Sequence, residues 1–597
     1  MNKIIIFLLL VAIVVGLLGA TSFGLIDINS NPMTQREEQY LDDKISKMIN
    51  EKQVKGAIVS FVSDHNISLC KGYGYANENA SIASDGSSTA FRIGSVSKTF
   101  IAIAALQLAA QGRLDMDTSI TLYIDGDFPQ LKYDVTMRNL LTHTAGFEEM
   151  LSGIAIYDKG KAEPLEVSIR KYMPAQVFPP GEVVSYSNYG IALAAYVIQC
   201  ITDQDFYLYA NENIFKPLNM TSTSFELDFS DVIISKAYKK NGEEAKEPYI
   251  NLYPEGSVVS TAEDMAKYML WLMDDSDKVL TTELKSQLFE NHFSMAEEFQ
   301  GMGFTWNRLE RNGVTYFDKK GETVNFYTRI ALYPKQKKGV FLSFNTYVEE
   351  AELDAIMEDV TTLILGQEQK YDTYTGFQSV DISGYYVSTR SNFEGLEKAL
   401  NLFMPNNVSI TGSLSQGFYM KGEALIPLGE NYYQTPIGNI KYVPGNDKDY
   451  LAMNRPISYV RVNWHENRIV QLLIILFFIL ASLILAIANF KIQRNIKSSK
   501  NGYPNLLFIS LPFINLIAVF IMCALIILGI SCFNILPLVF YISLCGYIIT
   551  FTSIIGIIST VSLFAEKIFL LQHILIVVWN SASVLFCLWM WQVNILF

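Results

Sequence analysis

Residues 91–111 read FRIGSVSKTFIAIAALQLAAQ, and this stretch is the starting point for the fold of the central part of the chain. From Ser97 onward it contains good helix formers and no breaker before Gly112, so we expect one helix over 97–111. Ser95 and Lys98 lie three residues apart, nearly one helical turn, which places the hydroxyl and the amine on one face. The Ser95 backbone N–H, at a helix N-terminus, can also bind a developing anion.

A serine and a lysine at this spacing can carry nucleophilic chemistry. A serine hydroxyl is a poor nucleophile unless a base lies beside it. Lys98 can be that base if burial and a neighbouring cation lower its pKa. Taken alone, S-x-x-K arises often by chance, and a helix-capping serine beside a solvated lysine is then the more common outcome.

Two further short motifs lie downstream. Tyr186-Ser187-Asn188 follows a Pro-Pro-Gly turn; the phenol can relay a proton, and the amide can hold a substrate carbonyl or steady the lysine. Lys319-Lys320-Gly321 precedes a strand expected over 323–333. A cation there can bind a substrate carboxylate, and glycine lets a substrate strand approach. Separately, each motif also fits an ordinary loop or hairpin turn.

Together, S-x-x-K, Y-x-N and K-x-G in this order resemble the penicillin-recognising serine enzymes. The sequence is most similar to the branch that contains class C β-lactamases, D-aminopeptidases, serine esterases and low-molecular-weight penicillin-binding proteins. The blocks VTMRNLLTHTAG at 135–146, IFKPLNM at 214–220 and STAEDM at 260–265 resemble that branch in the same order. The resemblance covers about residues 35–365.

The resemblance implies an α+β fold, with an antiparallel sheet flanked by helices, an all-helical lobe, and the site at their junction. It implies that Ser95 attacks a carbonyl and becomes acylated. Lys98 and Tyr186 would carry the proton of Ser95 to the leaving group and later activate water or an acceptor amine. His143 lies outside the family's catalytic set, and we expect a structural role for it.

The same resemblance assigns the substrate-binding residues. Asn188 would position the substrate, Lys319 would attract a carboxylate, and Gly321 would leave room for the substrate. The backbone N–H groups of Ser95 and Glu322 would form the oxyanion hole. Many members of the branch have small residues where Glu322 and Asn325 stand, so we expect a narrower groove or weaker carboxylate binding here.

Residues 370–465 have a different sequence pattern. Short alternating segments at 384–389, 407–411, 417–420 and 432–435 are separated by Gly, Asn and Pro. This pattern predicts a small antiparallel β module.

The two ends of the chain are apolar. The run at 4–20 follows a single lysine and predicts a signal peptide or an N-terminal anchor within 1–30. Beyond the β module, the region 469–597 contains four apolar stretches, each long enough to cross a bilayer, at 469–490, 506–530, 535–564 and 568–591.

The connection at 491–500 carries four cations and no acid, which predicts a cytoplasmic location. The preceding residues would then lie outside, in agreement with an export signal. We therefore expect a multi-pass protein of a bacterial cell membrane with its catalytic domain outside the cytoplasm.

Charge and composition limit the partners. The chain is 50% hydrophobic and only 18% charged, which favours contact with a lipid bilayer. Its net charge is −13; six basic and two acidic residues lie from Glu466 onward, so the first 465 residues carry −17. Such an acidic region argues against a nucleic-acid partner. No cluster of His, Cys and Asp has metal-ligand spacing, so we expect neither a metal nor another cofactor.

These observations predict a membrane-anchored serine hydrolase or acyl-transferase. Its substrate would be a small peptide, amide or ester, for example a cell-wall peptide that contains D-amino acids. Two alternatives remain: a β-lactamase or esterase with the same catalytic groups, and a non-enzymatic domain that senses envelope ligands. The deacylation rate separates the first from a penicillin-binding protein.

Overall fold

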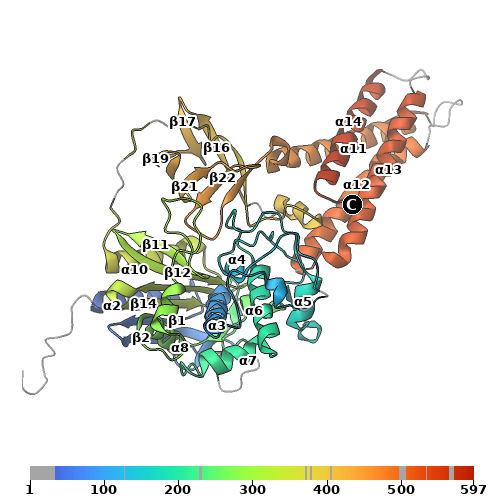
Figure 1. Cartoon of the computed structure of the whole chain (residues 1–597). Coiled ribbons are helices and arrows are strands. Elements are labelled where there is room, and N and C mark those ends of the chain that lie inside the picture. The colour runs from blue at the N-terminus through green and yellow to red at the C-terminus, as the bar shows by residue number, and fades with distance from the viewer. Residues whose placement is uncertain are drawn as a thin grey trace, which may run out of the picture.

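The structure is a computed structural model, shown in Figure 1. It describes residues 34–124, 126, 128–226, 232–369, 373–376, 380–403, 406–496, 506–532, 534–563 and 570–596. The signal peptide or anchor predicted within 1–30 lies outside these residues.

A seven-stranded antiparallel sheet forms the centre of the domain that contains the predicted catalytic residues, hereafter the catalytic domain. Its spatial order is β11 (Asn307–Arg311), β12 (Val314–Glu322), β13 (Tyr327–Tyr333), β14 (Lys338–Phe344), β1 (Gly56–Ser63), β2 (Asn66–Asn77) and β3 (Ile82–Ala83). Every residue of β1 is buried. This strand reads GAIVSFVS, an almost continuous small and apolar run, because helices cover both faces of the sheet.

The two faces of the sheet have separate cores. On one face, α2 (Thr34–Asn50) and α10 (Glu350–Leu365) pack against alternate residues of β1, including Val59 and Phe61. On the other face, Ile58 and Val62 join the core formed with α3 (Lys98–Ala110) and α8 (Ala262–Met273). The helix predicted over 97–111 is α3, which is buried along most of its length.

A helical lobe packs beside α3 and completes the predicted α+β architecture. Its helices are α4 (Met137–Leu141), α5 (Leu165–Lys171), α6 (Asn188–Thr202) and α7 (Phe206–Ala210), with the π-helical turn η4 (Asn211–Phe215). α9 (Thr282–Gln287) lies farther along the chain. Short strands complete the domain: β4 (Thr89–Arg92), β5 (Ala155–Ile156), β6 (Ile233–Ile234), β7 (Ala237–Tyr238), β8 (Glu244–Ala245), β9 (Tyr249–Ile250) and β10 (Val259–Ser260).

One predicted strand boundary is wrong. The strand expected over 323–333 begins only at Tyr327, and Lys319 to Gly321 lie at the end of β12 rather than before a new strand. The reason is a tight turn between the two strands, in which the Thr323 N–H donates to the Phe326 carbonyl at 3.0 Å. The apolar Val324 within this turn had extended the strand pattern.

The region 384–462 forms the predicted antiparallel β module. Its nine strands are β15 (Gly384–Ser388), β16 (Asn407–Ser413), β17 (Gly417–Met420), β18 (Glu423–Ala424), β19 (Ile426–Gly429), β20 (Tyr432–Thr435), β21 (Gly438–Val443), β22 (Tyr450–Met453) and β23 (Tyr459–Val462). Sequence neighbours pair throughout, except β18 with β19, and the first strand pairs with the last. The module is therefore an up-and-down meander curled back on itself, with one open seam.

The β module docks directly on the catalytic domain, above the sheet and α4 in Figure 1. Phe178 and Val183 of the catalytic domain share a buried apolar cluster with Tyr450 and Val460 of the module. The Tyr450 hydroxyl also donates to Glu182 at 2.8 Å.

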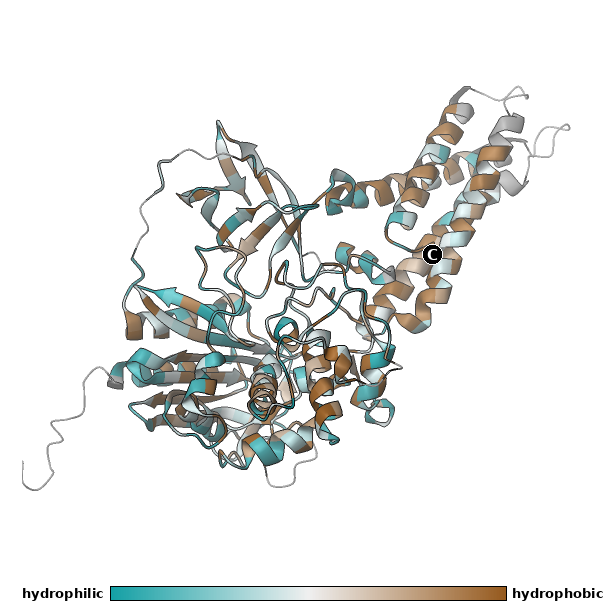
Figure 2. Cartoon of the chain, in the orientation of Figure 1, coloured by the Kyte–Doolittle hydropathy of each residue, from teal (hydrophilic) through white to brown (hydrophobic). Residues whose placement is uncertain are grey.

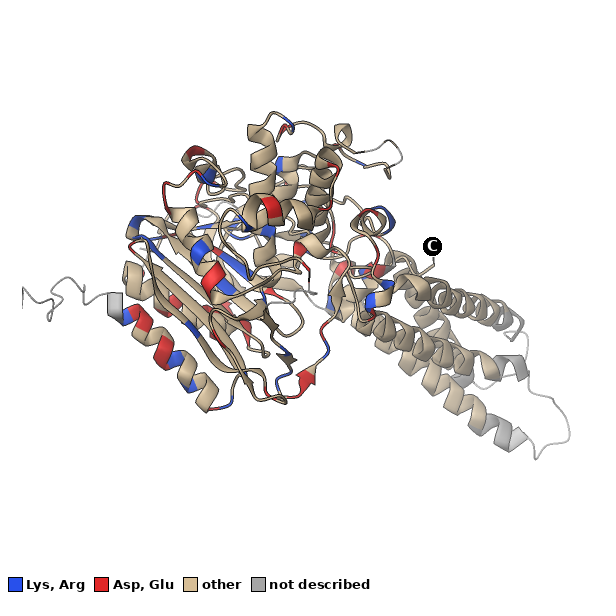
Figure 3. Ribbon diagram, turned by 90° about the horizontal axis from the view of Figure 1, so that it is seen from below, with Lys and Arg blue, Asp and Glu red and all other residues tan. Residues whose placement is uncertain are grey.

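Four long apolar helices follow, in agreement with the four predicted spans. They are α11 (Arg468–Ile496), α12 (Leu506–Ser531), α13 (Val539–Leu563) and α14 (Leu570–Gln592). Figure 2 shows the apolar colour concentrated in this bundle, and Figure 3 shows most of the coloured charged residues over the other domains. The cationic connection predicted at 491–500 begins within α11, which ends at Ile496, and residues 497–500 lie outside the described residues.

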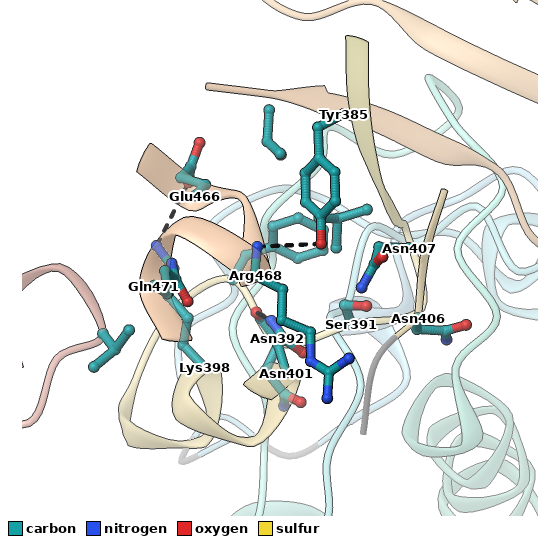
Figure 4. A pocket seen from close by; sticks show the side chains of 14 residues that line it. Tyr385, Ser391, Asn392, Lys398, Asn401, Asn406, Asn407, Glu466, Arg468 and Gln471 are labelled. Atoms are coloured by element: carbon teal, nitrogen blue, oxygen red, sulfur yellow. Dashed lines mark hydrogen bonds and ion pairs between the residues drawn. The ribbon is translucent and has the colours of Figure 1, made fainter. Parts of the chain in front are cut away.

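One end of the bundle contacts both the catalytic domain and the β module. The Ile535 N–H, in the connection between α12 and α13, donates to the Ser152 hydroxyl at 3.1 Å. At the start of α11, the Arg468 N–H donates to the Tyr385 hydroxyl at 3.3 Å. Figure 4 shows the small cavity at this junction, about 40 Å³ in volume, whose lining includes none of the predicted site residues.

Candidate active site

Ser95 lies in the 3-10 turn η1 (Gly94–Ser97), immediately before α3, and is half-buried. Gly94 makes this turn possible. Its φ is +52°, and a Cβ there would lie 2.4 Å from the Glu322 backbone nitrogen. The Ser97 hydroxyl donates to the Gly94 carbonyl at 2.6 Å and accepts from the Val258 N–H at 3.2 Å. The turn is thus fixed by its own sequence and by the neighbouring strand segment.

Lys98 is fully buried and has three acceptors. Its Nζ donates to Ser95 Oγ at 2.9 Å, to the Glu255 carbonyl at 2.6 Å and to Glu255 Oε2 at 2.8 Å. Burial lowers the pKa of Lys98, but Glu255 and Tyr186 together raise it more, so the pKa lies above its ordinary value. Lys98 was expected to act as a base only if burial and a neighbouring cation lowered its pKa. The three acceptors around Nζ instead match the three N–H groups of an ammonium.

Tyr186 is the second side chain that contacts Ser95, the predicted nucleophile. Its hydroxyl donates to Ser95 Oγ at 2.8 Å. Its ring stacks on His143, with 4.2 Å between the ring centroids. The Lys98 and Lys319 Nζ atoms lie 5.3 and 5.7 Å from the centroid of the Tyr186 ring. Two amines that can carry positive charge therefore lie near the Tyr186 ring.

His143 is a neutral side chain that packs against the Tyr186 ring. It is buried, and its Nδ1 accepts from the Ser187 N–H at 3.3 Å, which places the ring proton on Nε2. Burial, followed by the charges of Lys319, Lys98 and Arg390, lowers the pKa of His143 well below its ordinary value. The stacking contact agrees with the structural role expected for this residue.

Asn188 is the first residue of α6 rather than part of a loop. Ser187 caps this helix by accepting from the Gly190 N–H at 3.0 Å, so Tyr186 and Asn188 flank a fixed helix start. The Asn188 side chain is buried, and its Oδ1 has no hydrogen-bond partner among the described residues. An unpaired buried acceptor is costly, and a substrate N–H can satisfy it.

The end of β12 provides an open strand edge beside η1. β11 pairs with β12 only as far as Asp318, so Lys319, Lys320, Gly321 and Glu322 have no strand partner on that side. Gly321 is required for the approach, since a Cβ there would lie 2.0 Å from the Ile93 carbonyl oxygen. The Glu322 backbone nitrogen lies beside Gly94, so it is adjacent to Ser95, where the oxyanion hole was expected.

Lys319 is buried, and its Nζ donates to the Thr305 carbonyl. Burial, followed by the charge of Lys98, lowers the pKa of Lys319 to about 7. A carboxylate that binds next to it would favour the charged form.

The two residues that depart from the family pattern each contact a charged side chain. Glu322 pairs with Arg329 at 3.1 Å, and Asn325 donates to Glu247 at 3.2 Å. The Glu322 charge is thus partly neutralised before any substrate carboxylate arrives.

Sequence reasoning missed two charged residues of this site. Glu255 is the only charged residue in the stretch 250–262, INLYPEGSVVSTA, and an isolated acid among apolar residues is a signal for a buried partner. Arg390 lies in the β module, and its guanidinium carbon is 4.6 Å from the Tyr186 ring centroid. No motif in the sequence connects Arg390 with the catalytic domain.

Comparisons with known proteins were consistent with this geometry. The family model described as Beta-lactamase matches residues 38–360. Protein flp of Staphylococcus aureus (strain COL) is 25% identical over 355 residues, which span 57% of this chain and 69% of the relative. The putative penicillin-binding protein PbpX of Bacillus subtilis (strain 168) is 29% identical over 269 residues, 44% of this chain and 65% of that protein.

Among solved structures, the crystal structure of SurE superposes with a TM-score of 0.51 at 17% identity. The superposition covers 72% of this chain and all of the SurE chain. At this identity the likeness concerns the fold alone. Its coverage exceeds the share of the chain matched by the family model, so similarity of fold extends beyond residues 38–360.

Proposed function

Because this chain belongs to the beta-lactamase family, we propose that it is a membrane-anchored serine hydrolase or acyl-transferase that acts through an acyl-enzyme on Ser95. One observation carries the proposal: Ser95 Oγ is the common acceptor of Lys98 Nζ at 2.9 Å and the Tyr186 hydroxyl at 2.8 Å. A helix-capping serine beside a solvated lysine would need neither a fully buried lysine nor a phenol.

Acylation needs a group that accepts the Ser95 proton. In the geometry described, Lys98 already holds a full set of protons, so it acts as a fixed cation. Tyr186 is then the proton carrier: as a phenolate it takes the Ser95 proton while Oγ attacks the substrate carbonyl carbon. The carbonyl oxygen becomes an oxyanion and is held by the backbone N–H groups of Ser95 and Glu322.

Collapse of this intermediate breaks the bond to the leaving group, which takes the proton from Tyr186. In the second half, water or an acceptor amine gives a proton to Tyr186 and attacks the acyl carbon, and Ser95 regains its proton as it leaves. Lys98, next to both oxygens, stabilises negative charge throughout.

The substrate class follows from the other residues. Lys319 is a buried amine beside an open strand edge, and its charged form suits a substrate with a carboxylate. Asn188 offers a free amide oxygen for a substrate N–H. A peptide, amide or ester with a terminal carboxylate fits both, and a cell-wall peptide that ends in a D-amino acid has this chemistry.

We place this activity outside the cytoplasm. At one end of the bundle, the Ile535 N–H donates to Ser152 of the catalytic domain and the Arg468 N–H donates to Tyr385 of the β module. The cationic connection follows the opposite end of α11. Four cations without an acid favour the cytoplasmic side for that connection.

Labelling with a fluorescent penicillin tests the proposal. The protein in membranes should form a covalent adduct, and the Ser95→Ala variant should form none. The lifetime of the adduct then separates a slowly deacylating penicillin-binding protein from a β-lactamase. Failure of both a penicillin and a fluorophosphonate to label the protein would overturn the proposal in favour of an envelope-sensing domain.

A further inference from the structure

One cation of the β module reaches the active site. Arg390 follows β15, and its guanidinium carbon lies 4.6 Å from the centroid of the Tyr186 ring, closer than either lysine. The Arg390 side chain is 40% exposed, so it lies at an open rim rather than in a packed core.

The backbone of Tyr186 is attached to the same part of the module. The Thr389 hydroxyl donates to the Val184 carbonyl at 2.8 Å, and the Ser185 hydroxyl donates to the Thr389 carbonyl at 2.9 Å. Ser185 also forms a β-bridge with Ile457 of the module. Docking of the module therefore fixes Tyr186 and Arg390 relative to each other.

A segment of the catalytic domain, residues 148–152, holds the other side of Arg390. The Arg390 Nε donates to the Glu149 carboxylate. The Asn392 side chain donates to the Glu149 carbonyl at 2.6 Å, and the Glu397 carboxylate accepts from the Ser152 N–H at 2.9 Å. These bonds leave the Arg390 guanidinium little freedom to leave the Tyr186 ring.

We propose that Arg390 is a positioning residue of the active site, whose charge stabilises Tyr186 while that phenol carries negative charge. This inference rests on the proposed function, because it requires Tyr186 to act as the proton carrier. It makes the β module a part of the catalytic machinery rather than a separate appendage.

The balance of charges explains why this particular cation matters. Around Tyr186, Lys98 is paired with Glu255, and Lys319 is charged only in part near neutral pH because its pKa is about 7. His143, stacked on the ring, is neutral. Arg390 stays charged at every working pH and is offset by Glu149, with Glu255 farther away.

The test is the pH dependence of Ser95 labelling by a neutral fluorophosphonate. In this reaction the Ser95 Oγ–P bond forms, the P–F bond breaks, fluoride leaves and the Ser95 proton passes to Tyr186. The probe has no carboxylate, so Lys319 does not contribute to binding. Fluoride also leaves without a proton, so the rate reports the proton-accepting step.

Two substitutions that break the same ion pair should have opposite effects. Arg390→Gln removes the cation, so the acid limb of the pH–rate profile should move up by about one pH unit, with about a tenfold slower rate at neutral pH. Glu149→Gln leaves the cation without its counter-charge, so the acid limb should move to lower pH. Arg390→Lys should keep the acid limb of the unmodified protein.

Arg461 provides a matched control within the module. Its guanidinium carbon lies 6.0 Å from the Tyr386 ring centroid, and it pairs with Asp449 at 3.4 Å. Arg461→Gln should therefore affect the module about as much as Arg390→Gln does, without shifting the acid limb.

The outcomes separate the inference from the proposed function. Absence of labelling in the unmodified protein would contradict the proposed function itself. With normal labelling of that protein, an unshifted acid limb in Arg390→Gln would overturn the role of Arg390. Shifts of the acid limb in the same direction for Arg390→Gln and Glu149→Gln would also overturn it. Such shifts would show only that the ion pair holds the two domains together.

Discussion

The Glu255 carboxylate lies 2.8 Å from the Lys98 ammonium, and both side chains are buried. Glu255 reaches Lys98 from the 3-10 turn η5 (Tyr253–Glu255), 157 residues farther along the chain. This ion pair favours the ammonium form of Lys98, which contacts Ser95, and in the proposed mechanism Tyr186 is therefore the group that accepts the Ser95 proton.

Glu255→Gln should destabilise the catalytic domain. Removal of one partner of a buried ion pair leaves an uncompensated charge, which costs about 3 kcal/mol of unfolding free energy. Urea unfolding in detergent, followed by tryptophan fluorescence, measures the change. Glu349→Gln is the control, because the Lys240–Glu349 pair is exposed and its loss should change the unfolding free energy far less. Equal changes in unfolding free energy for the two substitutions would show that the buried pair stabilises the fold no more than an exposed pair does.

Tyr186→Phe should retain the fold and lose activity. The substitution removes one hydroxyl and leaves the ring that stacks on His143. Loss of a general acid–base group reduces the rate by about 10²–10⁴-fold. Acylation by a penicillin, measured by stopped-flow or gel fluorescence, reports the change. An acylation rate equal to that of the unmodified protein would restrict Tyr186 to a packing role.

Substrate binding should depend on the charge of Lys319. Its pKa is lowered to about 7, so the ammonium form predominates below pH 7 and is lost above it. We expect kcat/KM for a substrate with a free carboxylate to fall above about pH 7. The methyl ester of the same substrate should show no such fall.

Lys319→Arg tests the same point, because arginine stays charged throughout this range. The fall above pH 7 should be lost in this variant. Parallel pH profiles for the acid and the ester in the unmodified protein would show that Lys319 does not bind the carboxylate.

Membrane topology can be tested at two positions. An alkaline phosphatase fused near Lys497 should be inactive, because four cations in 491–500 resist translocation. A fusion after Phe597 should be active, since four spans return the chain to its starting side. An active enzyme at Lys497 would place the catalytic domain in the cytoplasm and remove cell-wall peptides as substrates.

The sequence predicted those parts of the fold that depend on local patterns. The breaker-free run after Ser97 became α3, the alternating segments after 384 became the β module, and the long apolar runs became four helices. The strand expected from Thr323 was shorter because a turn was hidden by an apolar residue, Val324. Hydropathy alone does not mark such a turn.

The candidate site was predicted less completely. Motif order brought Ser95, Lys98 and Tyr186 together, and the structure places them in direct contact. The sequence did not predict the Lys98–Glu255 ion pair, because the position of Glu255 follows from tertiary packing. Arg390 comes from a separate module, and contacts between domains leave no periodicity or spacing in the sequence.

The most direct measurement is the site of covalent modification. After incubation with a penicillin, peptide mass spectrometry of the unmodified protein should find one added penicilloyl group, on the peptide that contains Ser95. Ser95→Ala should carry none, while its circular dichroism spectrum stays unchanged. An adduct on another residue, or equal labelling of the Ser95→Ala variant, would contradict the assignment of Ser95 as the nucleophile.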